Sequence, residues 1–141
     1  MENTKKIAVI LSGCGQFDGS EIHEAICAML AIDMNGAKYE IYAPDKAQHQ
    51  VINHFDGEEM KETRNVLIES ARMARGKAKS LANLEVANYD ALVMPGGHGA
   101  AKNLSDYAFK GDAMTVDPLL ANCIQKANAA GIPIGAMCIA P

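Results

Sequence analysis

The sequence lacks the features that mark membrane, secreted and nucleic-acid-binding proteins. No apolar run approaches the roughly 20 residues that a membrane-spanning helix needs, and the N-terminal stretch MENTKKIAVILSG becomes polar too soon for a signal peptide. The net charge is −4, and acidic and basic residues are mixed along the chain, so no basic stripe can follow a phosphate backbone. We therefore expect no membrane and no nucleic acid among its partners.

Paired cysteines and metal-ligand spacings are absent as well. The four cysteines form no CxxC pair and no zinc-finger pattern: Cys14, Cys27, Cys123 and Cys138. Several acidic residues and histidines could suggest a metal site, yet none has ligand spacing: Asp18, His23, Glu24, His49 and His54. Thiols without disulfide spacing or a signal peptide are typical of a reducing compartment, and the cytoplasm is the predicted location.

What remains is the composition of one globular domain. Apolar residues make up 49% and charged residues 21% of the 141 residues, which are ordinary values. A chain of this length suits a single domain and can bury roughly two-thirds of its unfolded surface. We found no internal repeat, low-complexity tract or linker, so we predict one α/β domain over residues 1–141.

Apolar runs alternate with helical periodicity along the chain. Four runs predict strands, at residues 6–11, 39–43, 90–94 and 132–137. Helical spacing and end signals predict helices between Ser20 and Gly36, from Asn65 to Arg75, and between Asp117 and Gly131. The polar stretch from 45 to 63 is expected to be mostly loop. This alternation predicts a mainly parallel sheet sandwiched between helices through right-handed crossovers.

The first helix carries clear local signals. Ser20 is expected to cap it, and Glu21 stands in the first turn, where the helix dipole favours a negative charge. The apolar residues recur at helical spacing and predict one buried face: Ile22, Ala25, Ile26, Met29 and Leu30.

Three segments that could carry chemistry follow strands: residues 14–21, residues 95–99 and Cys138. In open parallel sheets, binding and catalytic sites form at the carboxyl ends of the strands. We therefore predict that these three segments converge on one site.

Cys138 is the candidate nucleophile. It ends a strand within GAMCIAP, and a nucleophile on a tight strand-to-helix turn needs small neighbours because the backbone bends sharply there. Such a turn also directs N–H groups at the sulfur, which favours the thiolate. The alternative is a buried core thiol, a common fate of cysteine.

The segment from Pro95 to Gly99 is rich in glycine, and its N–H groups could stabilise an oxyanion. A plain glycine turn is the alternative, and a nucleotide loop is not supported because GxGxxG lacks its last glycine and no GK[ST] follows. His98 could act as a base or be only solvated. Glu21 could lie near the thiolate, partly protonated, or be a simple helix-start charge. The other three cysteines are expected to be packing or loop thiols.

Long motifs then resemble a known family. VMPGGHGAAKNLSD and GAMCIAP resemble the PfpI-like superfamily, which is related in fold to class I glutamine amidotransferases. ILSGCGQFDGSEIHEA, YAPDK, VINH and ETRNVLIESARMARG narrow the resemblance to the ElbB group, also called the enhancing-lycopene-biosynthesis or ES1 family. The resemblance runs from Ile7 to Pro141.

The resemblance implies a flavodoxin-like three-layer sandwich with Cys138 in a nucleophile elbow. It implies Glu21 as the acidic neighbour of the thiol, the N–H groups of Gly97 and Ile139 as an oxyanion hole, and Gly96 and His98 beside them. It further implies a glutathione-independent glyoxalase that converts small dicarbonyls such as glyoxal to hydroxy acids, without metal or organic cofactor. Members of the superfamily commonly form homodimers, so a homodimer is expected.

Two departures from the family keep other functions open. Ile139 occupies the place where many members have histidine, so no amidotransferase-type triad can be assigned. The sequence also stops three residues after Cys138, which suggests a fragment lacking its C-terminal portion, and this chain alone is expected to be inactive and prone to associate. The alternatives are a non-catalytic redox-sensing or chaperone-like protein, and an amidase-like hydrolase.

Overall fold

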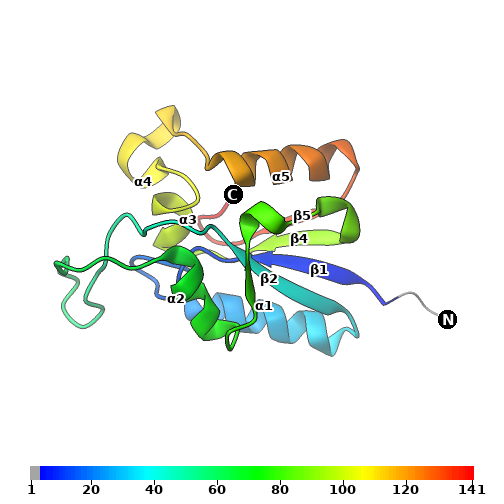
Figure 1. Ribbon diagram of the computed structural model, residues 1–141, viewed down its shortest axis with the longest axis horizontal. Coiled ribbons are helices and arrows are strands. Elements are labelled where there is room, and N and C mark those ends of the chain that lie inside the picture. Colours follow the sequence, from blue (N-terminus) through cyan, green and yellow to red (C-terminus); the bar gives the residue numbers. More distant parts are fainter. Residues whose placement is uncertain (1–3) are drawn as a thin grey trace.

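The computed structural model describes residues 4–141 as a parallel sheet with helices on both faces (Figure 1). The sheet has five strands in the order β3-β2-β1-β4-β5, all parallel within the described residues. The strands are β1 (Lys6–Ile10), β2 (Lys38–Ala43), β3 (Ala78–Ser80), β4 (Ala91–Met94) and β5 (Ile134–Ala136). The helices are α1 (Ile22–Met34), α2 (Val66–Met73), α3 (His98–Lys102), α4 (Tyr107–Lys110) and α5 (Pro118–Ala129). This arrangement confirms the predicted α/β, flavodoxin-like fold.

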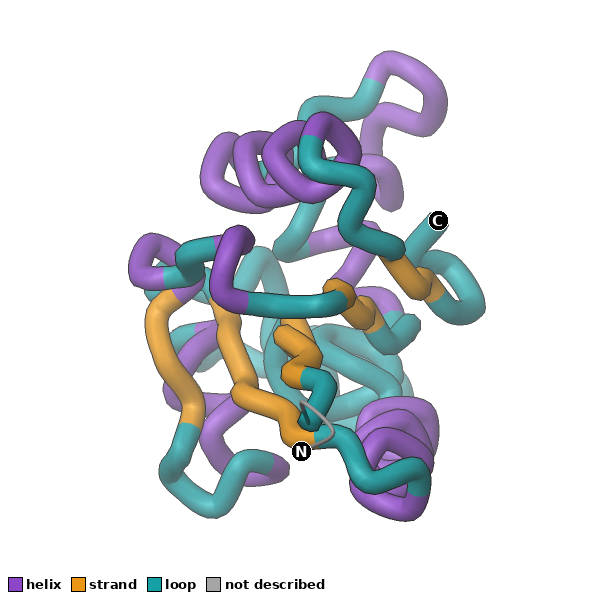
Figure 2. Tube along the Cα trace, turned by 90° about the vertical axis from the view of Figure 1, so that its right-hand side faces the viewer, coloured by secondary structure: helices purple, strands orange, loops and turns teal. Residues whose placement is uncertain are grey.

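Two apolar layers hold the helices to the sheet, one on each face (Figures 1 and 2). Val9 and Leu11 face α1 and α2, whereas Ala8 and Ile10 face α5, because successive side chains of a strand point to opposite faces. All four are fully buried, which explains why this strand reads as a continuous apolar run. Burial of a side chain such as Leu11 contributes roughly 1.5–3 kcal/mol.

The start of α1 differs from the prediction. Its N-cap is Glu21, whose side chain accepts a hydrogen bond from the Glu24 N–H, and the helix begins at Ile22. Ser20 is fully buried before the helix, where its hydroxyl accepts a hydrogen bond from the Ser12 N–H at 2.8 Å. The prediction that Ser20 caps the helix is therefore wrong, because its hydroxyl is already engaged by the end of the β1 strand region.

The predicted buried face of α1 is only half correct. Ala25 and Met29 are buried, but Ile22, Ile26 and Leu30 are 42%, 43% and 54% exposed. Ala25 and Met29 lie four residues apart and contact the sheet, while Ile26 and Leu30 lie further round the helix and Ile22 is the first residue of the helix. Helical spacing gave the period correctly but overestimated the width of the contact.

The remaining differences are at edges and short elements. β3 was not predicted, because the edge strand AKS is too short and polar to show a pattern. The short helices α3 and α4 and the 3₁₀ turns at Leu81–Asn83, Val86–Asn88 and Gly111–Ala113 were also missed. β5 is shorter than the predicted strand and forms one edge of the sheet. Within residues 4–141, every helix is too short or too polar to cross a membrane.

Candidate active site

Cys138 lies in a tight turn directly after β5. The Ala140 N–H donates to the Met137 carbonyl at 2.9 Å and closes the turn. Cys138 has a φ of +56°, a left-handed conformation that it shares with Arg75 among the non-glycine residues of the described chain. An L-residue in this region is destabilised by roughly 1–2 kcal/mol, and such strain concentrates at functional sites. The thiol-bearing residue is exposed, so the alternative of a buried core thiol is wrong.

Gly96 is the point at which three segments meet. A Cβ added to Gly96 would lie 2.5 Å from the Cys138 Cβ and 2.5 Å from Glu24 Oε2, so only glycine fits. The Gly96 N–H donates to Glu24 Oε2 at 2.7 Å. Glu24 and Cys138 therefore flank the same glycine, which places the Glu24 carboxylate beside the candidate nucleophile.

Glu21 lies close to this point through its backbone, and its carboxylate is committed elsewhere. Its N–H donates to the Gly96 carbonyl at 2.9 Å, while its two carboxylate oxygens pair with His23 Nδ1 at 2.9 Å and accept from the Glu24 N–H at 2.7 Å. The hydrogen bond with His23, followed by that from the Glu24 N–H, lowers the pKa of Glu21. Of the two interpretations of Glu21, these contacts favour the helix-start charge over a partly protonated carboxyl, because both stabilise the carboxylate. Its role as the acidic neighbour of the thiol stays a prediction.

The sequence analysis missed Glu24 as a site residue. The signal was present: Glu24 lies three residues after Glu21, so the two share one side of the first helical turn. The position of the helix start determines which of the two carboxylates can contact the site. Glu21 is the N-cap, so its side chain turns back to the helix N–H groups. Glu24 lies in the first turn of the helix, and its carboxylate accepts the hydrogen bond from the Gly96 N–H.

The loop of residues 12–20 and the glycine loop lie against each other, as predicted. The Gly99 N–H donates to the Gly19 carbonyl at 2.8 Å, and the His98 N–H donates to the Gln16 carbonyl at 2.8 Å. Gly97 has a φ of +97°, which an L side chain rarely adopts. The convergence of residues 14–21, residues 95–99 and Cys138 at the carboxyl ends of the strands is therefore found in the structure.

The expected oxyanion-hole amides differ in availability. Within residues 4–141, the N–H groups of Gly97 and Ile139 donate no hydrogen bond, and in this sense both are open, although Gly97 itself is buried. The Gly96 N–H is already engaged by Glu24, which removes it from the set of open donors. These two open N–H groups flank the turn and the loop that meet at Cys138, and their role stays a prediction.

His98 is exposed and begins α3. Its ring centroid lies 6.0 Å from that of Phe17, and it makes no hydrogen bond with Cys138 within the described residues. His98 as a base therefore stays a prediction. Phe17 in turn stacks on His54 at 5.0 Å, and its N–H donates to His54 Nε2 at 3.1 Å.

Asn103 is a buried polar residue that the sequence analysis also missed. Its side-chain amide donates to the carbonyls of Ser12 and Asp18, each at 2.9 Å, and its oxygen accepts from the His49 N–H at 3.0 Å. Asn103 is 3% exposed, and these contacts tie the end of α3 to two loops. A local sequence motif does not show which distant groups a side chain will contact, so this role could not be predicted.

The other cysteines differ in their surroundings. Cys123 is buried in α5, and burial raises the pKa of its thiol. Cys14 is half-buried in the loop beside α2, and burial raises its pKa as well. Cys27 is exposed on α1, so its prediction as a packing or loop thiol is wrong.

A cavity of about 490 Å³ opens beside the candidate nucleophile. Cys138 and Ile139 line one side, and mostly apolar residues line the rest: Met94, Leu104, Met114, Val116, Leu120 and Ile124. Within residues 4–141, no group of three or more His, Cys, Asp or Glu side chains could hold a metal ion. Cys138 and its surroundings combine a thiol, a carboxylate and two backbone donors.

Comparison with known proteins confirms the resemblance in sequence. The human glutamine amidotransferase-like class 1 domain-containing protein 3, mitochondrial, is 49% identical over 137 residues, which cover 96% of this chain and 51% of the human protein. The rat ES1 protein homolog, mitochondrial, is 49% identical over 137 residues, covering 96% of this chain and 52% of its own length. The chain thus spans about half the length of these relatives. No family model matches the sequence.

A solved structure confirms the fold. The isoprenoid biosynthesis protein with amidotransferase-like domain from Ehrlichia chaffeensis superposes with a TM-score of 0.92 at 44% identity, covering 96% of this chain and 64% of that protein. The expected cytoplasmic location is contradicted, because the human and rat relatives are named mitochondrial proteins. Thiol spacing separates oxidising from reducing compartments only, and it carries no information on which reducing compartment holds a protein.

Proposed function

We propose that this chain, whose close homologues are ES1 and glutamine amidotransferase-like class 1 proteins, carries the nucleophile of a glutathione-independent glyoxalase-type enzyme acting on small dicarbonyls such as glyoxal. The observation that supports this most is the left-handed, exposed Cys138 beside the Glu24 carboxylate at Gly96. Since the chain spans about half of its relatives' length, the activity is proposed for the whole protein.

In the first step, the sulfur of Cys138 attacks one aldehyde carbon of glyoxal. A C–S bond forms, the S–H proton leaves the sulfur, the carbonyl electron pair moves to oxygen, and the resulting oxyanion takes up that proton to give a thiohemiacetal. The open N–H groups of Gly97 and Ile139 are suited to hold that oxygen as its charge develops.

In the second step, a proton moves between the two carbons of the adduct. A carboxylate removes the proton from the carbon bonded to sulfur, giving an enediol, and a proton then adds to the neighbouring carbon. We assign this transfer to Glu24, because its Oε2 lies beside Gly96 and Cys138. For Glu21, the acidic neighbour implied by the resemblance, the contacts with His23 and the Glu24 N–H favour a positioning role instead.

The third step releases the product. The proton shift leaves a glycolyl thioester on Cys138, in which one carbon has been oxidised and the other reduced. Water attacks the thioester, the C–S bond breaks, and glycolate leaves with the thiol restored. The sum is glyoxal plus water to glycolate plus a proton, so no redox partner or cofactor enters the balance.

Amide hydrolysis is less well supported by this geometry. It needs a base that activates the thiol and then protonates the leaving amine, a task usually performed by histidine. No imidazole among residues 4–141 hydrogen-bonds to Cys138, and Ile139 follows it directly. A non-catalytic redox role would use the same exposed thiol. A measurement of glyoxal turnover distinguishes that role from catalysis.

The test is loss of glyoxal and formation of glycolate by the purified protein without glutathione. We expect Cys138→Ser to abolish turnover, whereas Cys27→Ser, which removes another exposed thiol, should leave it unchanged. Equal activity of the two variants would overturn the assignment of the nucleophile. Rapid alkylation of Cys138 without any turnover would favour the redox role.

The same assay separates the two glutamates. We expect Glu24→Gln to lower kcat by at least about 100-fold, the usual scale for a lost general acid or base. Glu21→Gln removes a charge at a helix cap and should act more weakly. The reverse order of effects would return the proton-transfer role to Glu21.

A further inference from the structure

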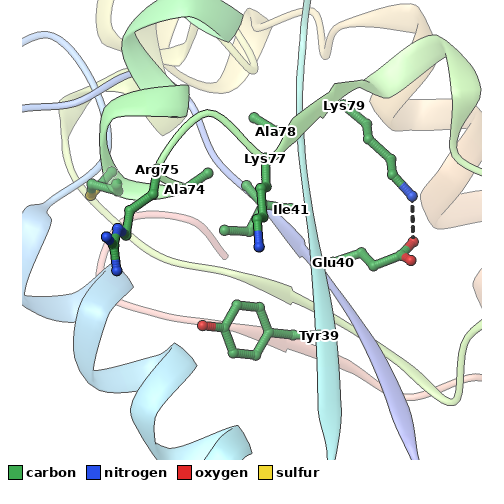
Figure 3. Close-up of a pocket in the computed structure, with 9 residues that line it drawn as sticks. Tyr39, Glu40, Ile41, Ala74, Arg75, Lys77, Ala78 and Lys79 are labelled. Atoms are coloured by element: carbon green, nitrogen blue, oxygen red, sulfur yellow. Dashed lines mark hydrogen bonds and ion pairs between the residues drawn. The ribbon is translucent and has the colours of Figure 1, made fainter.

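An open groove of about 780 Å³ lies away from Cys138, where β2, β3 and the end of α2 meet (Figure 3). Its floor is apolar and includes Ile41, Ala74 and Ala78. Tyr39 stands at one side with 38% of its surface exposed. The volume falls within the range of about 300–1,000 Å³ that is usual for small-molecule sites.

Two cations at the rim have no partner of their own. Arg75 and Lys77 are exposed, and neither side chain makes an ion pair or hydrogen bond with any group in residues 4–141. Figure 3 shows both extending to the same side of β2 as the Tyr39 ring. In a chain with a net charge of −4, this is a local concentration of positive charge.

The carboxylate among the lining residues does not cancel this charge. Glu40 and Lys79 pair at 3.0 Å, and Figure 3 shows that pair on the other side of β2 from Arg75. Strand alternation gives the reason: Tyr39 and Ile41 face α1 and α2, whereas Glu40 faces the opposite layer. The Glu40 side chain also contacts Lys6 and Tyr89 there.

The backbone at Arg75 is unusual for its residue type. Its φ is +52°, a left-handed conformation that glycine adopts freely and that costs an L-residue roughly 1–2 kcal/mol. Gly76 follows with a φ of +81°. The N–H groups of Arg75 and Gly76 donate to the carbonyls of Arg72 and Ala71, so this conformation is the C-terminal stop of α2, and it places the Arg75 side chain at the edge of the groove.

We propose that this groove binds a small organic phosphate, with the anionic group on Arg75 and Lys77 and an apolar or planar body against Ile41, Ala78 and the Tyr39 ring. Arginine binds phosphate oxygens through parallel N–H donors, and lysine adds a point charge. The apolar floor provides the part of the site that a free inorganic ion cannot use. The site lies outside the proposed catalytic centre and does not depend on it.

The test is a titration of the ¹⁵N-labelled protein followed by amide NMR shifts, with hexyl phosphate as the probe. We expect shifts at residues 39–41 and 75–79. Arg75→Gly should weaken binding by about 10-fold, the effect of losing one charged contact of about 1.4 kcal/mol, without loss of thermal stability because glycine suits this backbone. Lys77→Gln should weaken it several-fold, and Lys126→Gln on α5 should have no effect.

Four results would overturn the proposal. One is unchanged affinity in both Arg75→Gly and Lys77→Gln. Another is a set of shifts that lies outside the groove. The third is equal affinity for hexyl phosphate and inorganic phosphate, which would exclude a role for the apolar floor. Binding to vesicles that contain phosphatidylglycerol, without binding of soluble hexyl phosphate, would likewise exclude a small-molecule site.

Discussion

Two clusters of side chains in this protein are each built around one glutamate, and they differ in how many hydrogen-bond donors that glutamate has. Glu40, on β2, is surrounded by donors: the hydroxyls of Tyr89 and Tyr42 and the ammonium groups of Lys79 and Lys6. Glu24, on α1, accepts one N–H from Gly96 and lies beside a strained, exposed cysteine. The first cluster has its hydrogen-bonding groups satisfied, and the second leaves a thiol and two N–H groups open.

The difference separates stability from chemistry. A fully paired carboxylate such as Glu40 holds the sheet to the layer above it, because each donor stabilises its charge. A partly satisfied carboxylate beside a nucleophile can exchange a proton with a ligand. Both residues are glutamates, so residue type alone does not distinguish them. Substitutions that change one cluster at a time separate the two roles.

The largest effect is expected at Gly96. Gly96→Ala would force a methyl group against both the Cys138 Cβ and Glu24 Oε2, each 2.5 Å from the added carbon. We expect at least about a 100-fold loss of glyoxal turnover, the scale seen when reacting groups move by about 1 Å. Gly135→Ala is the matched control, because its added carbon would meet the Val93 side chain at an ordinary 3.7 Å. Comparable activity of the two variants would contradict the assigned geometry.

The next effect concerns stability at Glu40. The Tyr89 hydroxyl and then the Lys79 ammonium group lower the pKa of Glu40 to about 2. A lowered pKa in the folded state adds stability above the unfolded pKa of about 4.3, and this contribution is lost as the pH falls from there towards 2. With the side chain 31% exposed, we expect Glu40→Gln to cost about 1–2 kcal/mol at neutral pH.

Denaturant unfolding at pH 7 and at pH 3 tests this prediction. The gap between wild type and Glu40→Gln should be largest at pH 7 and should narrow at pH 3. Turnover of the folded variant should equal that of wild type. A gap that widens in acid would show that the Glu40 carboxylate does not stabilise the fold as described.

The smallest expected effect is a change in stability that has opposite signs at the two exposed cysteines. Cys138→Gly relieves a left-handed backbone strain of roughly 1–2 kcal/mol and loses roughly 0.5–1 kcal/mol to the flexibility of glycine, a net gain of about 0.5 kcal/mol. Cys27→Gly, within α1, should destabilise by a few tenths of a kcal/mol up to about 1 kcal/mol. Thermal unfolding of both variants measures the difference, and equal destabilisation would argue against strain at Cys138.

Much of the fold followed from local pattern. The run at β1 predicted a buried strand because both faces of that strand are covered, and Asp117 with Pro118 predicted the start of α5. Short or polar elements such as β3 could not be predicted, since their conformation depends on neighbours already in place. The prediction for Ser20 failed for the same reason, because a distant N–H at Ser12 takes its hydroxyl.

The candidate site also combines features that follow from local pattern with features that depend on tertiary neighbours. Local pattern was enough to place Cys138 just after a strand among small residues and a glycine loop after another strand, because both are local properties of the chain. The choice of the Glu24 carboxylate over that of Glu21 as the partner of Gly96 came from the fold, because a helix turns about 100° per residue and its start must be known to place a side chain. In the same way, only the fold places the cations Arg75 and Lys77 beside one face of β2.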